Sequence, residues 1–380
     1  MISLLIAIIY IAFISLGLPD SLLGSAWPTM HVEFSAPLSF AGVISMIITF
    51  GTIISSLLSD RLTRRFGAGT VTAVSTAMTA LALLGFSQSN AVWMLCLFAI
   101  PYGLGAGAID AALNNYVAIH YAARHMSWLH CMWGLGATVS PYIMSAALSG
   151  THGWQGGYFT VSVIQMVLTL FLFLSLPLWK KSEAAEEITK KPREKNVFKI
   201  KGVTAVLVTF LCYCALESTA GLWASSYLVF ARGVDATVAA RFAALFYMGI
   251  TVGRFLSGFV ADKLGDKRLI RIGLSVIAVG IICLALPIEV CALAGLIVIG
   301  FGCAPIYPSI IHSTPHNFGE ENSQKIVGIQ MASAYTGSAL MPPLFGALCE
   351  VLPVWIYPIY LAVFALLMVI MSERLNKLVK

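Results

Sequence analysis

Residues 253–268 read GRFLSGFVADKLGDKR, an apolar segment that ends abruptly in a short, charge-rich turn. Residues 56–65, SLLSDRLTRR, have the same arrangement, at an offset of 202 residues from the match that begins at Gly258. On both sides of each stretch the chain returns to long apolar runs. The two turns therefore look like equivalent points in two copies of one helical unit.

The composition of the whole chain places these runs in a membrane. Of the 380 residues, 59% are hydrophobic and 11% are charged, whereas soluble domains carry about 25% charged residues. So few charges cannot cover a soluble protein of this size, which excludes most soluble enzymes and binding modules. A spanning helix needs about 20 mainly apolar residues. Twelve such runs are predicted near residues 2–30, 37–59, 69–88, 91–119, 127–149, 156–179, 202–230, 237–261, 269–288, 291–315, 325–350 and 353–372.

The basic residues predict the orientation of the runs. With the N-terminus inside, 20 of the 23 Lys and Arg residues fall in the cytoplasmic connections and tails. This positive-inside bias predicts that both termini are cytoplasmic in a multi-pass protein of the plasma (inner) membrane. It also explains the net charge of +6 without a nucleic-acid partner. The polar stretch 180–201 predicts a cytoplasmic linker between an N-terminal six-helix bundle, 1–179, and a C-terminal one, 202–380.

Further internal matches support the duplication. DSxxG at 20–24 matches ESxxG at 217–221, and GLG at 103–105 matches GFG at 300–302, both at an offset of 197 residues. GxxxxP at 136–141 matches GxxxxP at 337–342 at an offset of 201. Four matches in one order indicate a parallel duplication, for which binding sites are expected near the midplane between the halves.

The turn at 258–268 resembles the signature loop of the major facilitator superfamily, Gly-x-x-x-Asp-(Arg/Lys)-x-Gly-(Arg/Lys)-(Arg/Lys). The resemblance implies an all-α integral membrane fold, with twelve transmembrane helices in two six-helix bundles related by pseudo-two-fold symmetry. In the first-half copy, Ser56 and Thr63 replace the two glycines. The gating residues that we predict from the two loops are Asp60, Arg61, Arg64, Arg65, Gly258, Asp262, Lys263 and Gly265. Arg254 is placed with them, and is expected to snorkel or pair near the gate, or alternatively to bind a substrate anion.

Three carboxylates, Asp20, Asp110 and Glu217, fall well inside apolar runs. Ionisable groups are expensive in a bilayer, so each is a candidate functional residue. Burial disfavours the ionised carboxylate, so each could load and release a coupling proton. Asn114 follows Asp110 by one helical turn on the same face, which suits hydroxyl groups or a shared proton. The alternative is a polar interhelical contact without a role in transport.

GLPDSL at 17–22 with GAGAIDAALNNYV at 105–117 is similar to the fucose–galactose–glucose:proton symporter branch, which includes sodium-dependent glucose carriers. The resemblance implies that Asp20 and Asp110 bind substrate and proton. Asp110 stands where that branch often has Glu, and Asn115 where it often has Pro. Aromatic faces and amide or hydroxyl groups together suit a sugar. The substrate-binding candidates are Asn114, Asn115, Trp27, His130, Trp133, Trp223, Tyr227, Tyr307, Gln330 and Tyr335.

These features predict a secondary active transporter that works by alternating access, with proton-coupled uptake of a sugar or similar neutral hydroxylated solute. The alternatives are a proton-coupled antiporter that exports a drug or metabolite, and a sodium-coupled sugar carrier. No nucleotide-binding, GxSxG or HExxH motif occurs, which argues against an ATP-driven pump or an enzyme. We expect no cofactor and no metal, a small-molecule substrate, contact with membrane lipid, and a monomer.

Overall fold

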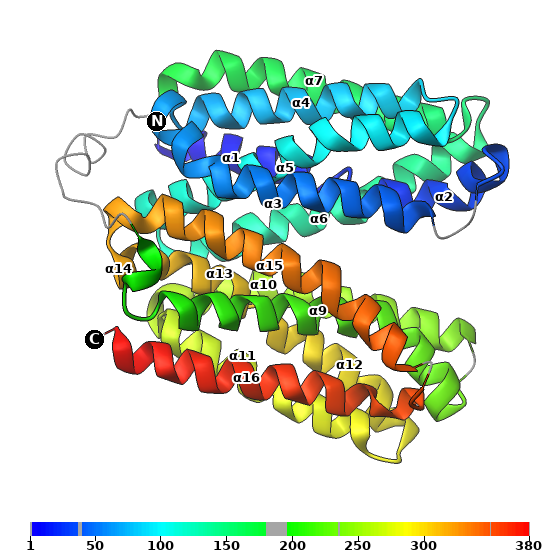
Figure 1. Ribbon diagram of the computed structural model, residues 1–380, viewed down its shortest axis with the longest axis vertical. Helices are drawn as coiled ribbons and strands as arrows, with labels where there is room; N and C mark the ends of the chain where they lie inside the picture. The colour runs from blue at the N-terminus through cyan, green and yellow to red at the C-terminus, as the bar shows by residue number, and fades with distance from the viewer. Residues whose placement is uncertain (1, 37–39, 180–195, 235, 350, 380) are drawn as a thin grey trace. The chain divides into compact units, whose positions relative to one another are not determined.

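The computed structural model describes residues 2–36, 40–179, 196–234, 236–349 and 351–379, and these residues form helices joined by short turns (Figure 1). Eight helices within the described ranges are long and apolar enough to cross a membrane. The expected all-α architecture is therefore confirmed. The chain separates into two compact units, Met1–Tyr116 with Leu129–Pro192, and Val117–Trp128 with Arg193–Lys380.

The first unit contains the helices of the N-terminal half. They are α1 Ile2–Gly17, α2 Leu22–Glu33, α3 Phe40–Phe66, α4 Ala68–Ser87, most of α5 Val92–His120, α6 Ala123–Ser149 from Leu129 on, α7 Gly153–Ser175 and the short η1 Leu176–Leu178. The segment 117–128 belongs to the second unit. The sequence instead predicts a division at the linker, with this segment in the N-terminal bundle. Residues 180–195, most of the predicted linker, lie outside the described residues.

The second unit contains the remaining helices. They are η2 Val197–Lys199, α9 Val203–Arg232, α10 Ala236–Leu264, α11 Asp266–Ala285, α12 Glu289–Cys303, α13 Ile306–His312, α14 Thr314–Phe318, α15 Glu320–Cys349, η3 Val354–Ile356 and α16 Tyr357–Leu378. Within the described residues, each of the twelve predicted runs falls mainly on helix, and the first and tenth runs are interrupted. The first breaks between α1 and α2 at Pro19, and the tenth between α12 and α13 at Pro305, because a proline removes a backbone donor.

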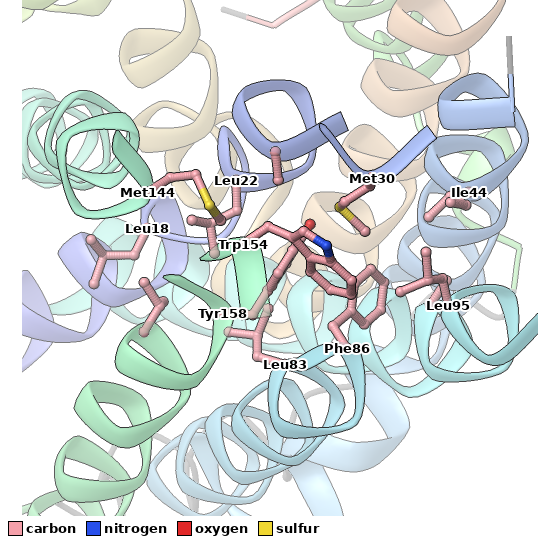
Figure 2. Packing of buried hydrophobic residues seen from close by; sticks show 13 residues of the cluster. Leu18, Leu22, Met30, Ile44, Leu83, Phe86, Leu95, Met144, Trp154 and Tyr158 are labelled. Carbon is pink, nitrogen blue, oxygen red and sulfur yellow. The ribbon is translucent and has the colours of Figure 1, made fainter. Parts of the chain in front are cut away.

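A hydrophobic cluster of buried aliphatic and aromatic side chains lies in the first unit (Figure 2). The Tyr158 ring lies 5.2 Å from Phe86 between centroids, and the Trp154 indole Nε1 donates to Glu33 Oε2 at 2.6 Å. This contact accounts for an acidic residue at the end of α2. It also joins α2 to α7, the helix that packs along α4.

Close helix approach positions the polar residues of the first unit. A Cβ on Gly17 would collide with the backbone oxygen of Trp133, and one on Gly136 with that of Ile14. The backbones of α1 and α6 are therefore nearly in contact. Gly103 and Gly107 likewise lie against the α3 backbone, as small residues in membrane helices often do.

Candidate functional site

The first polar cluster surrounds Asp20, in the break between α1 and α2. The Tyr102 hydroxyl donates to Oδ1 at 3.0 Å, and the Trp133 indole donates to Oδ2 at 2.8 Å. Tyr102 is buried and Trp133 half-buried, while the Asp20 side chain itself is exposed. Ser21 adds a hydrogen bond from its hydroxyl to the Ala137 carbonyl of α6, at 2.7 Å. The cluster is thus an exposed carboxylate whose two oxygens accept hydrogen bonds from two aromatic side chains.

The second cluster lies in the same unit and is closed from solvent. Asn114 Nδ2 donates to Asp110 Oδ1 at 2.8 Å, which confirms the predicted shared face on α5. The Asn114 Oδ1 atom lies 2.9 Å from His130 Nε2. Since the amide oxygen can only accept, this geometry requires the proton on Nε2. The three side chains are at most 5% exposed, and the amide links the carboxylate to the imidazole.

The third cluster lies in the second unit. Arg254 Nη2 of α10 is 3.5 Å from Glu217 Oε1 of α9, with side chains 5% and 19% exposed. The guanidinium carbon of Arg254 lies 6.0 Å from the ring centroid of Tyr307 in α13. Tyr213 packs against Tyr307 at 5.9 Å and donates to the Cys303 carbonyl at 3.1 Å. Arg254 is therefore buried, and it is paired with Glu217.

The partners of the three carboxylates differ in charge. Asp20 and Asp110 accept hydrogen bonds from neutral groups, the phenol, the indole and the amide. Glu217 instead faces a guanidinium, so that this pair is neutral without a proton. Hydrogen bonding satisfies a carboxylate oxygen but does not cancel its charge. Glu217 therefore differs from Asp20 in having a cationic partner.

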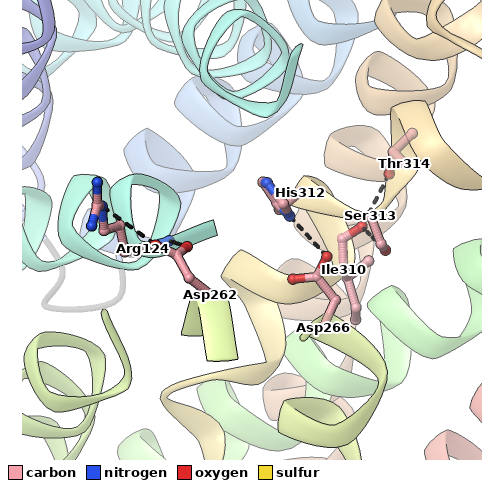
Figure 3. Close-up of polar contacts among 7 residues, drawn as sticks. All are labelled: Arg124, Asp262, Asp266, Ile310, His312, Ser313 and Thr314. Carbon is pink, nitrogen blue, oxygen red and sulfur yellow. Dashed lines mark hydrogen bonds and ion pairs between the residues drawn. The ribbon is translucent and has the colours of Figure 1, made fainter. Parts of the chain in front are cut away.

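The signature loop of the second half has the expected geometry (Figure 3). Gly265 adopts φ 73° between α10 and α11, a conformation that favours glycine. Asp262 accepts from the Arg124 backbone N–H at 3.2 Å, in the first turn of α6, and its Oδ2 lies 3.4 Å from Arg124 Nε. The aspartate thus caps a neighbouring helix start. Asp266 stands where the signature has Arg or Lys, and its Oδ2 lies 2.8 Å from His312 Nδ1.

The first-half loop keeps its turn glycine at a position that the sequence comparison missed. Asp60 is 3.2 Å from Arg64 on its own helix, and α3 continues to Phe66. Gly67 then adopts φ 80° and ψ 155° before α4, close to the 73° and 158° of Gly265. After its aspartate α3 continues to Phe66, whereas α10 ends at Leu264, two residues after Asp262, so the first-half turn lies beyond Thr63. The apparent loss of the glycine is therefore a shift along the helix.

The other predicted gating residues lie at these two turns. Arg61, Arg65 and Lys263 are exposed on the last turns of α3 and α10, and Arg65 lies over the Phe66 ring. A Cβ on Gly258 would meet the Trp128 indole, whose Nε1 donates to the Phe255 carbonyl at 3.3 Å. Segment 117–128 is thus attached to α10 by two side chains, Arg124 and Trp128.

Several predicted substrate residues instead hold helices together. Trp223 donates to the Pro342 carbonyl at 3.0 Å, and Tyr227 to the Leu284 carbonyl at 2.9 Å. Neither contact involves Glu217. Gln330 is buried and accepts from Thr314 at 3.1 Å. Asn115 is buried and Tyr335 half-buried, while the side chain of Trp27 lies outside the described residues.

Three residues at these sites were not predicted. Tyrosines are common in membrane helices, so the sequence does not distinguish Tyr102 or Tyr213, and Arg124 lies in a predicted connection between two runs. For the Glu217–Arg254 pair a signal existed. A lone cation and a lone carboxylate in neighbouring apolar runs favour a pair, since buried charges are usually compensated. Across the described side chains, no group of His, Cys, Asp and Glu is arranged to hold a metal ion.

Comparisons with known proteins agree with this architecture. The sequence profile of the Major Facilitator Superfamily matches residues 9–288 and 205–375. Bypass of stop codon protein 6 of Saccharomyces cerevisiae is 22% identical over 286 residues, which cover 68% of this chain and 57% of that protein. The glucose/mannose transporter GlcP of Bacillus subtilis is 21% identical over 356 residues, 89% of this chain and 86% of that one.

Among solved structures, the transporter FucP in its outward conformation has a TM-score of 0.81 at 13% identity, and 97% of each chain is covered. FucP of E. coli is also described as a fucose:proton symporter. This likeness confirms the twelve-helix fold inferred from the signature loop. The family and its solved members are transporters rather than enzymes, which confirms that interpretation as well. With its profile matched from residue 9 to residue 375, this chain is a multi-pass membrane protein that belongs to the Major Facilitator Superfamily.

Proposed function

We propose that this protein is a secondary transporter that takes up a sugar or similar neutral, hydroxyl-rich solute together with a proton, by alternating access. The observation that carries the proposal is the difference between the two carboxylates of the first unit. Asp20 is exposed between aromatic side chains, whereas Asp110 is buried in a hydrogen-bonded chain. One carboxylate can reach a solute and the other can hold a proton out of contact with it.

Asp20 has the surroundings of a sugar-binding carboxylate. Its two oxygens accept hydrogen bonds from Tyr102 and Trp133, and these bonds fix the orientation of the carboxylate. Each oxygen keeps a lone pair that can accept a hydrogen bond from a solute hydroxyl. The half-buried Trp133 ring offers an apolar face for the C–H side of a sugar ring. The relatives support this class of solute, since GlcP is a glucose/mannose transporter and FucP a fucose:proton symporter.

Asp110 is the carboxylate that we assign to the coupling proton. An ionised carboxylate is costly at 4% exposure, and the amide of Asn114 binds it without neutralising it. Protonation would remove this cost, which favours rearrangement of the loaded transporter. His130, on the far side of Asn114, would stabilise the amide orientation that serves Asp110. We further propose a monomer in the plasma membrane with both termini in the cytoplasm.

The test compares Asp110→Asn with wild type in proteoliposomes. We expect the variant to keep solute counterflow and to lose uphill uptake driven by a proton gradient, because counterflow requires no net proton movement. Glu33→Gln is the matched control, since it removes a carboxylate of the same unit that binds Trp154 outside the three clusters. Uphill uptake by Asp110→Asn equal to that of the control at every pH would refute the assignment.

The solute itself is identified by a thermal-shift screen of sugars, polyols and organic acids on the purified protein. A stabilising sugar or polyol should lose its effect in Trp133→Phe, which removes the indole donor to Asp20. Stabilisation by organic acids alone would contradict the proposed neutral solute.

A further inference from the structure

A cavity of about 370 Å³ opens at one end of the second unit, and none of its lining residues belongs to the cluster of Glu217 and Arg254. Its walls come from η2, the first turns of α9 and the last turns of α16. Two candidate membrane spans, Val203–Ala224 and Val354–Leu378, start or end here. The cavity therefore lies at the level where the spans meet the membrane surface, on the side predicted to be cytoplasmic.

The polar part of the wall carries only positive charge. Lys199, Lys201 and Arg374 line the cavity, and the lining residues, all of them in described segments, include no Asp or Glu. The acidic neighbour of Arg374 on α16, Glu373, is bound by Arg271 through two contacts of 2.6 and 2.8 Å. Its charge is thus compensated elsewhere, and the three cations face the cavity as a group.

The other part of the wall is apolar and continues down the membrane-facing surface of α16. Phe198 and Leu378 line the cavity and are 58% and 42% exposed. On α16 an exposed stripe runs through Ile359, Val363, Leu366 and Ile370. At helical spacing the same face continues through Arg374 to Leu378, so the stripe leads directly into the cavity.

We propose that this cavity binds one anionic phospholipid, with the headgroup phosphate at Lys199, Lys201 and Arg374 and an acyl chain along the exposed stripe of α16. Basic pockets at the ends of spanning helices suit anionic headgroups, because each cation near the surface adds attraction for a negative lipid. The inference requires only that the chain is embedded in a membrane, so it holds whatever solute is carried. A soluble phosphate ester shares the headgroup chemistry but leaves the apolar wall and stripe uncovered.

The experiment uses the purified full chain in detergent micelles. Thermal unfolding is measured against added phosphatidylglycerol, phosphatidylcholine or glycerol 3-phosphate, and retained lipid is counted by native mass spectrometry. For wild type we expect one retained phosphatidylglycerol, bound at least about tenfold more tightly than phosphatidylcholine. Glycerol 3-phosphate should not stabilise the protein, because it cannot occupy the apolar wall.

The decisive variant is Lys201→Gln with Arg374→Gln, which removes two of the three cations. We expect its affinity for phosphatidylglycerol to fall about ten- to thirtyfold, and its melting temperature in phosphatidylcholine to stay near that of wild type. The matched control, Lys267→Gln with Lys377→Gln, removes two exposed cations at the ends of α11 and α16 that do not line the cavity.

Three outcomes would overturn the proposal. Equal loss of phosphatidylglycerol in the two variants would mean general attraction to a basic surface. Equal binding of phosphatidylcholine by wild type would mean that the cations do not select the headgroup. Stabilisation by glycerol 3-phosphate as strong as that by the lipid would assign the cavity to a soluble phosphate compound.

Discussion

The buried pair of Glu217 and Arg254 should be strongly coupled in stability. At 3.5 Å, two unit charges attract by about 5 kcal/mol at an effective dielectric constant of about 20. Removing one partner from a buried pair typically costs about 3–5 kcal/mol, because the other charge is left uncompensated. Glu217→Gln and Arg254→Gln should each lower the melting temperature by roughly 6–20 °C. The double variant should recover most of the loss, since no buried charge remains.

The assay is thermal unfolding of the detergent-solubilised chain, followed by tryptophan fluorescence for wild type, both single variants and the double variant. The control is the same cycle at Arg271 and Glu373, a pair in the same unit with a shorter contact of 2.6 Å but side chains 56% and 38% exposed. Exposed pairs contribute about 0–1 kcal/mol, so those variants should change little. If the two losses at the buried pair simply add in the double variant, or if the exposed pair costs as much, burial does not determine the strength of this contact.

Three further predictions concern packing, acid stability and the signature turn. Gly17→Val should separate α1 from α6 and lower the melting temperature by several degrees, whereas Gly42→Val, which meets nothing within 4 Å, should not. Burial, reinforced by the Arg124 cation, lowers the pKa of His125 from 6.5. His125→Gln should therefore reduce the stability lost as the pH falls below 6.5, measured as melting temperature against pH. Gly265→Ala should cost about 1–3 kcal/mol, because φ there is 73°, and chemical denaturation should detect it.

Local features of the fold follow from the sequence alone. The contact of Asp110 with Asn114 was predictable because residues four apart share a helix face. The close approach at Gly103 and Gly107 was predictable for a similar reason, since small residues in membrane helices mark contacts. Both inferences need only the helical repeat and the composition of one run.

Partners on other helices did not follow from the sequence. Tyr102 lies 82 residues from Asp20, and Trp133 lies 113 residues from it. No periodicity relates positions so far apart, because their contact depends on how α1, α5 and α6 pack. The same holds for Trp223 and Tyr227, whose hydrogen-bond partners lie on α15 and α11.

The duplication bears on the proposed proton coupling, because positions that match between the two halves differ in charge. The offset of 197 residues relates Asp20 to Glu217 and Asp110 to Tyr307, and the offset of 202 relates Thr52 to Arg254. Thr52 carries no charge, and in the first unit it is buried with its hydroxyl donating to the Ile48 carbonyl at 2.9 Å. With both carboxylates ionised, the three positions sum to −2 in the first unit, whereas Glu217, Arg254 and Tyr307 sum to zero. Proton binding would therefore neutralise charge in the first unit, whereas a proton on Glu217 would leave the Arg254 cation uncompensated.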